Sequence, residues 1–270
     1  MADTPRTTRD VTPADVADVV ADPRRATLTF VDDGEPAIVP VRARRERDRW
    51  RFAAAAPALD DREVVLLLDD GDWWFELRGV SVRGVAAATA TAGTPSSRGA
   101  SSRGAMGASA FDASDARVRD FLDASTVVEL ATVSPSGRPF VTPLWFVGDD
   151  GALYVTTSAT SRAARNVATH PAVAMLLHGD RDGRRDRVLL LRGSATVHHA
   201  FPSWRVLAKL ALKYHVSPRG ALSELRHAAQ WPLRLLYYAD GRGGPAHLRI
   251  VPTAAEIVPA SPRGEVDRSA

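Results

Sequence analysis

The pattern Gly-x-Pro-x-x-x-Pro occurs twice in this chain, at residues 34–40 and at residues 137–143. Each copy follows an apolar run that contains threonine, at residues 26–31 and at residues 128–133. Glycine and proline placed between apolar runs are typical of a turn that joins two strands. The repeat therefore predicts that one β-rich unit is present twice in the chain.

Strand-like runs separated by Gly, Asp and Pro fill both halves of the 270-residue chain. Most of them are joined by short turns, which favours an antiparallel, closed sheet over a doubly wound one. We expect strands at residues 26–31, 37–43, 49–53, 63–68, 73–87, 127–133, 139–147, 152–157, 172–178, 187–198 and 246–258. We expect helices at residues 13–21, 111–124, 203–214 and 219–238, the second of them starting at Asp112 or Ser114.

A stretch of small polar residues separates the two halves. Residues 89–110 are rich in Ala, Ser, Thr and Gly and show no periodicity, which is typical of a flexible linker. We therefore place an N-terminal unit at residues 13–88 and a C-terminal unit at residues 111–258, with a helical insert at residues 199–240. The aromatic run at residues 73–75 is expected to pack against the second unit.

The two copies differ in length after their third strand. The tripeptide Leu-Arg-Gly closes each copy, at residues 77–79 and at residues 191–193, so the two tripeptides lie 114 residues apart. The Gly-x-Pro patterns lie only 103 residues apart, so the second copy has gained eleven residues between them. The gain corresponds to residues 156–171, which read as a polar turn followed by a helix.

This added segment has the residue types of an anion-binding site. Free N–H groups at a helix start, the helix dipole and guanidinium groups all favour a bound phosphate. An ordinary capped surface helix with solvated arginines fits the segment equally well, so both interpretations stay open. The hydroxyl and guanidinium side chains concerned are those of Thr156, Thr157, Ser158, Ser161, Arg162 and Arg165.

Residues 118–198 resemble the pyridoxamine 5′-phosphate oxidase-like, flavin-binding split-barrel superfamily. The resemblance rests on Ala-Thr-Val at residues 131–133, on the second Gly-x-Pro pattern followed by Trp145, and on Thr-x-x-x-Ser-Arg-x-x-x-Asn at residues 157–166, closed by Pro171. It implies a mainly β (α+β) protein made of two split β-barrels in tandem, which form a pseudo-dimer within one chain. The N-terminal barrel, which lacks the added helix, is then the degenerate copy.

The resemblance also implies a cofactor, FMN or a deazaflavin, in a cleft between the two barrels. The strand at residues 140–145 would flank the ring system with Trp145 as a wall, and the added segment would surround the phosphate. Relatives often have lysine where this chain has Ala163, so Arg162 or Arg165 would have to supply the missing charge. The cofactor-binding residues so implied are Val141, Thr142, Pro143, Trp145, Thr156, Thr157, Ser161, Arg162, Arg165 and Asn166.

These observations predict a flavin- or deazaflavin-dependent oxidoreductase of that type, acting on a small molecule. No catalytic acid or base stands out, which is compatible with chemistry supplied by the cofactor. The alternative is a non-catalytic split barrel that binds another ligand such as haem, or that serves as a scaffold or sensor. Ala163 and the degenerate first copy favour that alternative. The basic helices within residues 203–238 would lie near the cleft.

Composition excludes several other classes. The chain has no cysteine, so disulfides, iron–sulfur clusters and thiolate catalysis are excluded. Its seven histidines do not form a zinc-binding spacing, so we expect no metal. The net charge is only +3 and the arginines are spread along the chain, so neither nucleic acid nor a membrane is expected as a partner. We expect a soluble cytoplasmic protein that is a monomeric pseudo-dimer or a homodimer.

Overall fold

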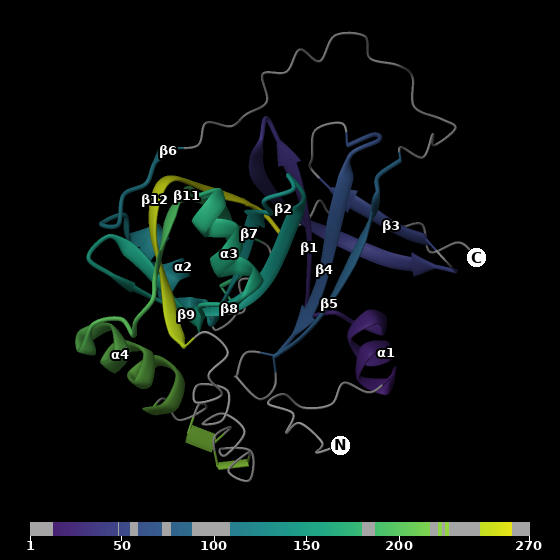
Figure 1. The fold of residues 1–270 in the computed structure, drawn as a ribbon. Coiled ribbons are helices and arrows are strands. Elements are labelled where there is room, and N and C mark those ends of the chain that lie inside the picture. Colours follow the sequence, from purple (N-terminus) through teal and green to yellow (C-terminus); the bar gives the residue numbers. More distant parts are fainter. Residues whose placement is uncertain are drawn as a thin grey trace, which may run out of the picture.

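The structure is a computed structural model that describes residues 13–47, 49–54, 59–71, 77–87, 109–179, 187–216, 221–222, 225–226 and 244–260. Two antiparallel sheets, one from each half of the sequence, lie side by side in it (Figure 1). Because the described ranges have gaps, three predictions fall wholly or mostly outside them. These are the aromatic run at 73–75, the linker at 89–108 and the helix at 219–238.

The first half forms an open sheet with the strand order β3-β2-β1-β4-β5. One helix, α1, precedes this sheet and packs on it through Val19. This sheet is an open half-barrel, in contrast to the sheet of the second half. The elements are α1 (Pro13–Ala21), β1 (Arg25–Asp32), β2 (Glu35–Glu46), β3 (Arg49–Ala54), β4 (Glu63–Asp70) and β5 (Arg78–Val85).

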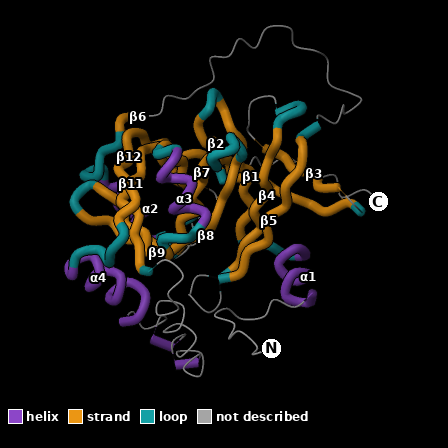
Figure 2. Tube along the Cα trace, viewed as in Figure 1, coloured by secondary structure: helices purple, strands orange, loops and turns teal. Residues whose placement is uncertain are grey.

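The second half forms a closed barrel of six strands in the order β11-β10-β7-β8-β9-β12, because β11 also pairs with β12 (Figure 2). The short strand β6 pairs with β12 outside this ring, within the stretch that the sequence assigned to the linker. The elements are β6 (Ser109–Ala110), α2 (Ala116–Ala124), β7 (Val127–Val133), β8 (Pro139–Asp149), β9 (Ala152–Ser158), α3 (Arg162–Thr169), β10 (Ala172–Leu177), β11 (Arg187–His198), α4 (Trp204–Ala211), the π-helix η2 (Leu212–Val216) and β12 (Pro245–Pro259).

The repeated glycine has the same conformational role in both copies. Gly34 and Gly137 have φ of +84° and +75°, a region that glycine enters without the steric cost of a Cβ atom. Each lies in the turn that leads into the strand carrying the two prolines, β2 in the first half and β8 in the second. The equivalence of the two patterns therefore extends to the backbone.

Helix α2 begins later than the sequence suggested. Its N-cap is Asp115, whose side chain accepts a hydrogen bond from the backbone N–H of Arg117. Asp112 instead accepts hydrogen bonds from the backbone and the hydroxyl of Ser114, and this local turn keeps both residues out of the helix. The prediction of Asp112 or Ser114 as the first residue was therefore wrong by one to three residues.

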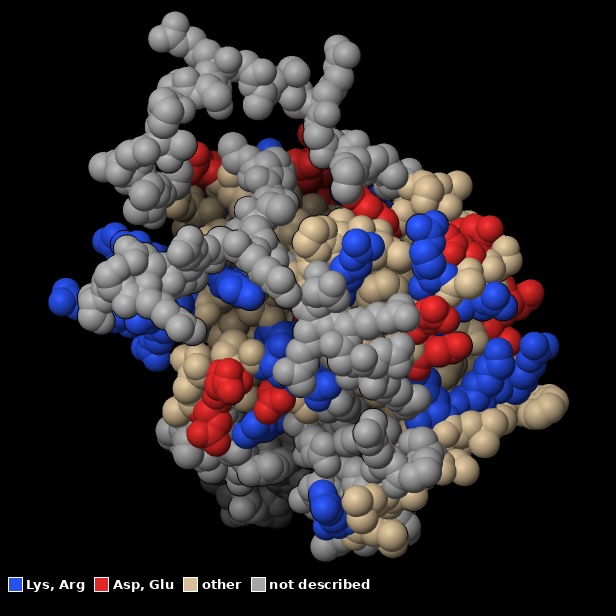
Figure 3. Space-filling view, turned by 180° about the vertical axis from the view of Figure 1, so that it is seen from behind, with Lys and Arg blue, Asp and Glu red and all other residues tan. Residues whose placement is uncertain are grey.

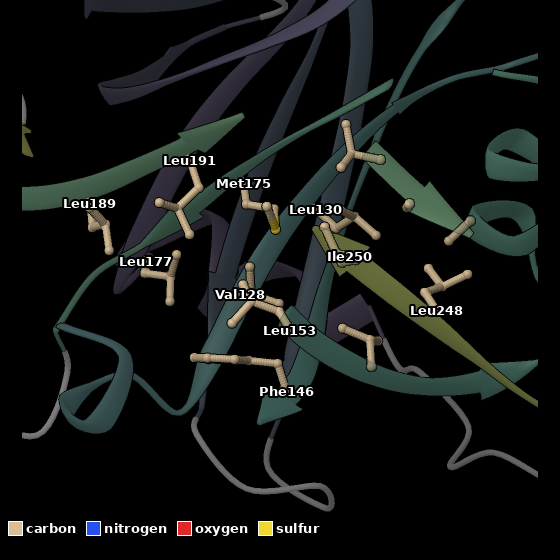
Figure 4. Packing of buried hydrophobic residues seen from close by; sticks show 14 of the residues in the cluster. Val128, Leu130, Phe146, Leu153, Met175, Leu177, Leu189, Leu191, Leu248 and Ile250 are labelled. Atoms are coloured by element: carbon tan, nitrogen blue, oxygen red, sulfur yellow. The ribbon is translucent and has the colours of Figure 1, made fainter. Parts of the chain in front are cut away.

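Apolar side chains of the barrel strands fill its interior (Figure 4). Val128, Leu130, Phe146 and Met175 have no exposed surface there. Alternation along each strand sends these side chains inward and their neighbours outward. Several outward-facing residues of β7, β8 and β10 are also apolar, namely Ala131, Val141, Ala174 and Leu176, so this part of the barrel needs a second layer.

The first sheet supplies that layer. Ile38, Val65 and Leu67 project from β2 and β4 and pack in one cluster with Ala131 and Val141 of the barrel. Because all five side chains are at most 5% exposed, the contact is a continuous apolar core between the two halves. This arrangement is the pseudo-dimer within one chain that the family resemblance implied.

Charged side chains are also buried in this contact. Arg25 Nε donates a hydrogen bond to Asp69 within the first sheet, and Thr27 donates one to Glu129 of the barrel. His178 Nε2 lies 3.1 Å from Glu129 Oε2. The pKa of Asp69 is raised to about 7, mainly by burial and also by the negative charge of Glu129, while Arg25 opposes both effects. The contact therefore holds two carboxyl groups and one arginine out of water.

None of the described helices is long and apolar enough to cross a membrane.

Candidate functional site

Strand β8 changes its partners along its length. Its first part, from Pro139 to Trp145, pairs with β7, whereas Phe146 to Asp149 pair with β9. The ladder with β9 begins at Phe146 and Val155, and the next pair in that register, Trp145 with Thr156, is not formed. On its other edge β9 pairs with β12 from Leu153 to Ser158, so the end of β9 keeps a partner on that side only. The barrel wall therefore opens between the first part of β8 and the end of β9, and we call this opening the split.

The residues implied by the sequence come from three segments that border the split. Four are on the first part of β8, two at the end of β9, and four at or inside the start of α3, the helix that follows β9. The opening thus brings together segments that are separate in sequence. In chain order the residues are Val141, Thr142, Pro143 and Trp145, then Thr156 and Thr157, then Ser161, Arg162, Arg165 and Asn166.

Helix α3 has one buried and one exposed face. Ser161 is its N-cap and accepts a hydrogen bond from the backbone N–H of Ala164 at 3.1 Å. Arg162 and Arg165 lie on the exposed face, and neither forms an ion pair with another described residue. The Arg162 guanidinium carbon lies 5.8 Å from the centre of the Phe140 ring on β8. The helix start therefore places two unpaired cations beside the split.

The substitution of alanine at position 163 has a packing reason. Ala163 is 3% exposed and belongs to the apolar cluster inside the barrel, together with Ala164 and Val167. A lysine here would have to place its ammonium group in that core or displace the helix, at a cost of several kcal/mol. Any cationic contact from α3 must therefore come from Arg162 and Arg165.

Three of the implied residues have structural partners. Asn166 is buried, and its amide donates a hydrogen bond to the hydroxyl of Thr132 on β7 at 2.9 Å. Val141 is buried in the contact between the halves, and Thr157 is 7% exposed at the inner side of β9. The hydrogen bond of Asn166 thus links α3 to the barrel wall, and Val141 and Thr157 are buried side chains next to the split.

Trp145 stacks on another side chain rather than standing free. Its ring lies 4.2 Å from that of Tyr214, with an angle of 6° between the planes. The Tyr214 hydroxyl is anchored by the backbone of Phe146, whose N–H donates to it at 3.0 Å, and by the carbonyl of Thr126 at 2.8 Å. One face of the Trp145 indole is therefore covered by η2, and only the opposite face is available as a wall.

Sequence reasoning missed a group of polar rings next to the split. His247 on β12 pairs with Thr156, stacks on His198 at 4.7 Å and lies beside Tyr154. Desolvation lowers the pKa of His198, and the nearby charges of His247 and Arg249 lower it further. The ring that stacks on His198 lies 49 residues away in the sequence, so no local spacing reveals the pair. In the described part of the chain, no cluster of three metal-ligating side chains occurs.

A cavity of about 620 Å³ lies elsewhere, between α2, the β8–β9 turn and α4. It contains none of the residues implied for the cofactor. Its charged side chains balance, so the cavity has no preference for an anionic ligand. They are Arg119, Lys209 and Lys213 on one side and Asp123, Asp149 and Asp150 on the other.

Comparison with solved structures finds similar chains at low similarity. A haem storage protein from Vibrio cholerae is 19% identical with a TM-score of 0.37, and the alignment covers 54% of this chain and 93% of that one. An F420 reductase is 25% identical with a TM-score of 0.33, over 48% and 88% of the two chains. A putative pyridoxamine 5′-phosphate oxidase from Listeria innocua is 15% identical with a TM-score of 0.35, over 53% and 95%. Nothing about the ligand of this chain follows from such similarities.

No curated protein matches the sequence. The family model described as pyridoxamine 5′-phosphate oxidase matches residues 114–229, which run from just before α2 through α3 and α4. This range contains both the second Gly-x-Pro pattern and the complete segment added to the second copy. The second barrel of the chain is therefore similar to the pyridoxamine 5′-phosphate oxidase family over residues 114–229.

Proposed function

We propose that this protein is an oxidoreductase that binds FMN or a deazaflavin in the split, with the cofactor phosphate at the start of α3. One observation carries the proposal: the β8–β9 ladder stops at Phe146 and Val155, and α3 presents two unpaired arginines beside the resulting opening. A phosphate there would receive charge-assisted hydrogen bonds from Arg162 and Arg165. The dipole of α3 would favour the same position.

The hydrogen-bond donors at the start of α3 are of the types that bind phosphate. Ser161 caps the helix, and the first backbone N–H groups of α3 have no partners inside the helix. The exposed arginines supply the positive charge that Ala163 cannot. These groups are those expected at helix-start phosphate sites. The residues that would hold the phosphate are therefore Ser161, Arg162 and Arg165.

The open edge of β8 suits a planar heterocycle. From Pro139 to Trp145 this strand has a ladder partner on one side only, so the other edge keeps backbone N–H and C=O groups for a ligand. One of these groups is already used, because Arg83 of the first sheet donates to the carbonyl of Pro139 at 3.1 Å. The groups further along the strand would bind the polar rim of the cofactor ring.

Strand β5 of the first sheet lies close to β8, the strand that borders the split. At Gly79 on β5, an added Cβ atom would lie 3.7 Å from the Pro143 ring, so the strand passes close to β8. Since only the second half contains the added helix, we infer one cofactor site per chain. A bound flavin supplies hydride transfer, and the protein binds it, orients it and limits the access of water.

A second candidate function is non-catalytic binding of a ligand such as haem. Two observations favour it: Tyr214 covers one face of Trp145, and His198 lies exposed beside the split with a lowered pKa. A neutral imidazole is the form that binds haem iron. This candidate makes no use of Arg162 and Arg165, so the two functions make different predictions for the same variants.

The absorption spectrum of the purified protein, before and after incubation with each cofactor, separates the two functions. The proposal predicts a bound flavin or deazaflavin band that survives gel filtration. Replacing Arg162 and Arg165 with alanine should abolish it, because each charge-assisted bond contributes about 1.5–3 kcal/mol. The matched control replaces Arg117 and Arg119 on the exposed face of α2. A haem band, or no band with any cofactor, would overturn the oxidoreductase proposal.

A further inference from the structure

The hairpin of β2 and β3 carries a concentration of arginine. Six of the ten residues from Arg42 to Arg51 are arginine, with one glutamate and one aspartate among them. The hairpin forms the edge of the first sheet, on the side away from the barrel (Figure 1). Seen from behind, basic side chains lie at the left-hand edge of the molecule, on the side of this hairpin, and others lie at the right-hand edge (Figure 3). The arginines of the hairpin thus lie at one extremity of the fold.

Pairing in the hairpin sorts these side chains onto two faces. The apolar face carries Trp50 and Phe52, which pack on the core of the first sheet. The opposite, exposed face carries four arginines in register, because side chains two residues apart lie on the same side of a strand. They are Arg42 and Arg44 on β2 and Arg49 and Arg51 on β3. We call this exposed face the arginine ribbon.

Repulsion between like charges lowers the stability of the arginine ribbon. Arg44 and Arg51 are directly opposite each other, and like charges in that position destabilise a hairpin. Only Arg51 has an acidic partner, Glu46 at 2.7 Å, and both side chains of that pair remain largely exposed. Arg42, Arg44 and Arg49 form no ion pair with any described residue. The exposed face therefore carries four arginines and a single described carboxylate, Glu46, which lies opposite Arg49.

We propose that the arginine ribbon binds the phosphate backbone of a nucleic acid duplex without reading its sequence. Guanidinium groups match phosphate oxygens with paired hydrogen bonds, and a two-stranded ribbon is narrow enough to enter the major groove. The arginines of residues 42–51 are already close together in the sequence, and the hairpin places four of them on one face. The ribbon lacks the exposed aromatic side chains that stack on single-stranded bases.

The test is the salt dependence of binding to a short fluorescein-labelled DNA duplex, measured by fluorescence anisotropy with the full chain. Four phosphate contacts should give a slope of about −3 to −4 when the logarithm of the association constant is plotted against the logarithm of the salt concentration. Replacing Arg44 and Arg51 with glutamine should reduce the slope by about 2 and weaken binding more than about tenfold at 0.1 M salt. The matched control, Arg117→Gln with Arg119→Gln, should bind as the unchanged protein does.

Thermal unfolding of the single variant Arg44→Gln excludes a merely structural explanation. Because this change removes a like-charge pair and leaves Arg51 with Glu46, it should weaken binding without lowering the melting temperature. Three results would overturn the proposal: no binding at about 50 mM salt, equal binding by the ribbon variants and the control, or tighter binding to phosphatidylglycerol vesicles than to the duplex. The last result would assign the ribbon to a lipid surface.

Discussion

The hydroxyl of Thr27 on β1 donates a hydrogen bond to the carboxylate of Glu129 on β7, 102 residues later in the chain. Both residues have no exposed surface, and they belong to opposite halves of the pseudo-dimer. The second carboxylate oxygen of Glu129 has no hydrogen-bond partner in the described structure. The bond therefore ties the two halves together at a buried charge, where its loss would be costly.

Replacing Thr27 with valine should destabilise the protein by about 1–3 kcal/mol. Valine keeps the shape of threonine but leaves a buried carboxylate with fewer hydrogen bonds, and an unsatisfied buried acceptor costs about that much. Urea unfolding measures the change. The control is Thr196→Val on the exposed side of β11, which should alter stability by less than about 0.5 kcal/mol. Equal effects of the two substitutions would refute the assigned bond.

Stability should fall as pH rises from about 4 to about 7. Asp69 has a pKa of about 7 in the folded protein against 3.8 for an unperturbed group, so the folded state keeps a proton that the unfolded state has released. This contribution is fully present below pH 3.8 and is lost as pH approaches 7, with a slope of at most about 1.4 kcal/mol per pH unit. Urea unfolding at several pH values measures it. In Asp69→Asn the decline should be absent, and an identical decline would contradict the assignment to Asp69.

Alanine at position 193 should destabilise the protein strongly, by about 3 kcal/mol, whereas alanine at position 79 should be tolerated. A Cβ atom at Gly193 would meet the carbonyl of Val251 and lie 2.8 Å from Pro252 Cα, where β11 and β12 shift register. At Gly79 the nearest atom is a flexible leucine methyl at 3.5 Å. Overpacking against backbone typically costs about 1–3 kcal/mol or more. If thermal unfolding ranked the two variants the other way, the predicted strand approach would be wrong.

Tyr214→Phe should cost about 1–3 kcal/mol and leave the tryptophan stack in place. The change removes the hydroxyl that accepts from Phe146 N–H and donates to backbone carbonyls, but it keeps the ring on Trp145. Tyr214→Leu should also remove the stack and shift tryptophan fluorescence. Calorimetry together with emission spectra separates these effects. Identical spectra for the two variants would show that Trp145 does not depend on Tyr214.

Much of the fold could be predicted because it is encoded locally. The repeated glycine occupies a turn in both copies, and the strands between turns follow from apolar alternation. The position of α3 was predicted correctly from the eleven residues by which the second copy is longer. A length difference between two copies can be seen in the sequence without knowledge of tertiary contacts. The start of α2 was misplaced because Asp112 and Asp115 are equally good caps by residue type, and the bonds of Asp112 to Ser114 decide between them.

The details of the site depended on contacts between distant residues. Trp145 was expected as a wall of the cofactor site, but its stacking partner Tyr214, 69 residues later in the chain, could not be predicted. His247 reaches Thr156 only because β12 pairs with β9, and Glu129 is buried only because the first sheet covers β7. None of these relationships produces a periodic signal along the sequence. Residue types predicted which segments border the split, and packing decided which of their side chains remain exposed.

The most direct test of the proposed site compares the affinities for FMN and for riboflavin, which lacks the phosphate, by titration of flavin fluorescence. The unchanged protein should prefer FMN by about 10²- to 10⁴-fold, since two charge-assisted contacts to phosphate, each of about 1.5–3 kcal/mol, are at stake. In the variant with Arg162 and Arg165 replaced by alanine this preference should disappear, while riboflavin binds as before. An unchanged preference in that variant, or no binding of either flavin to the unchanged protein, would contradict a phosphate site at the start of α3.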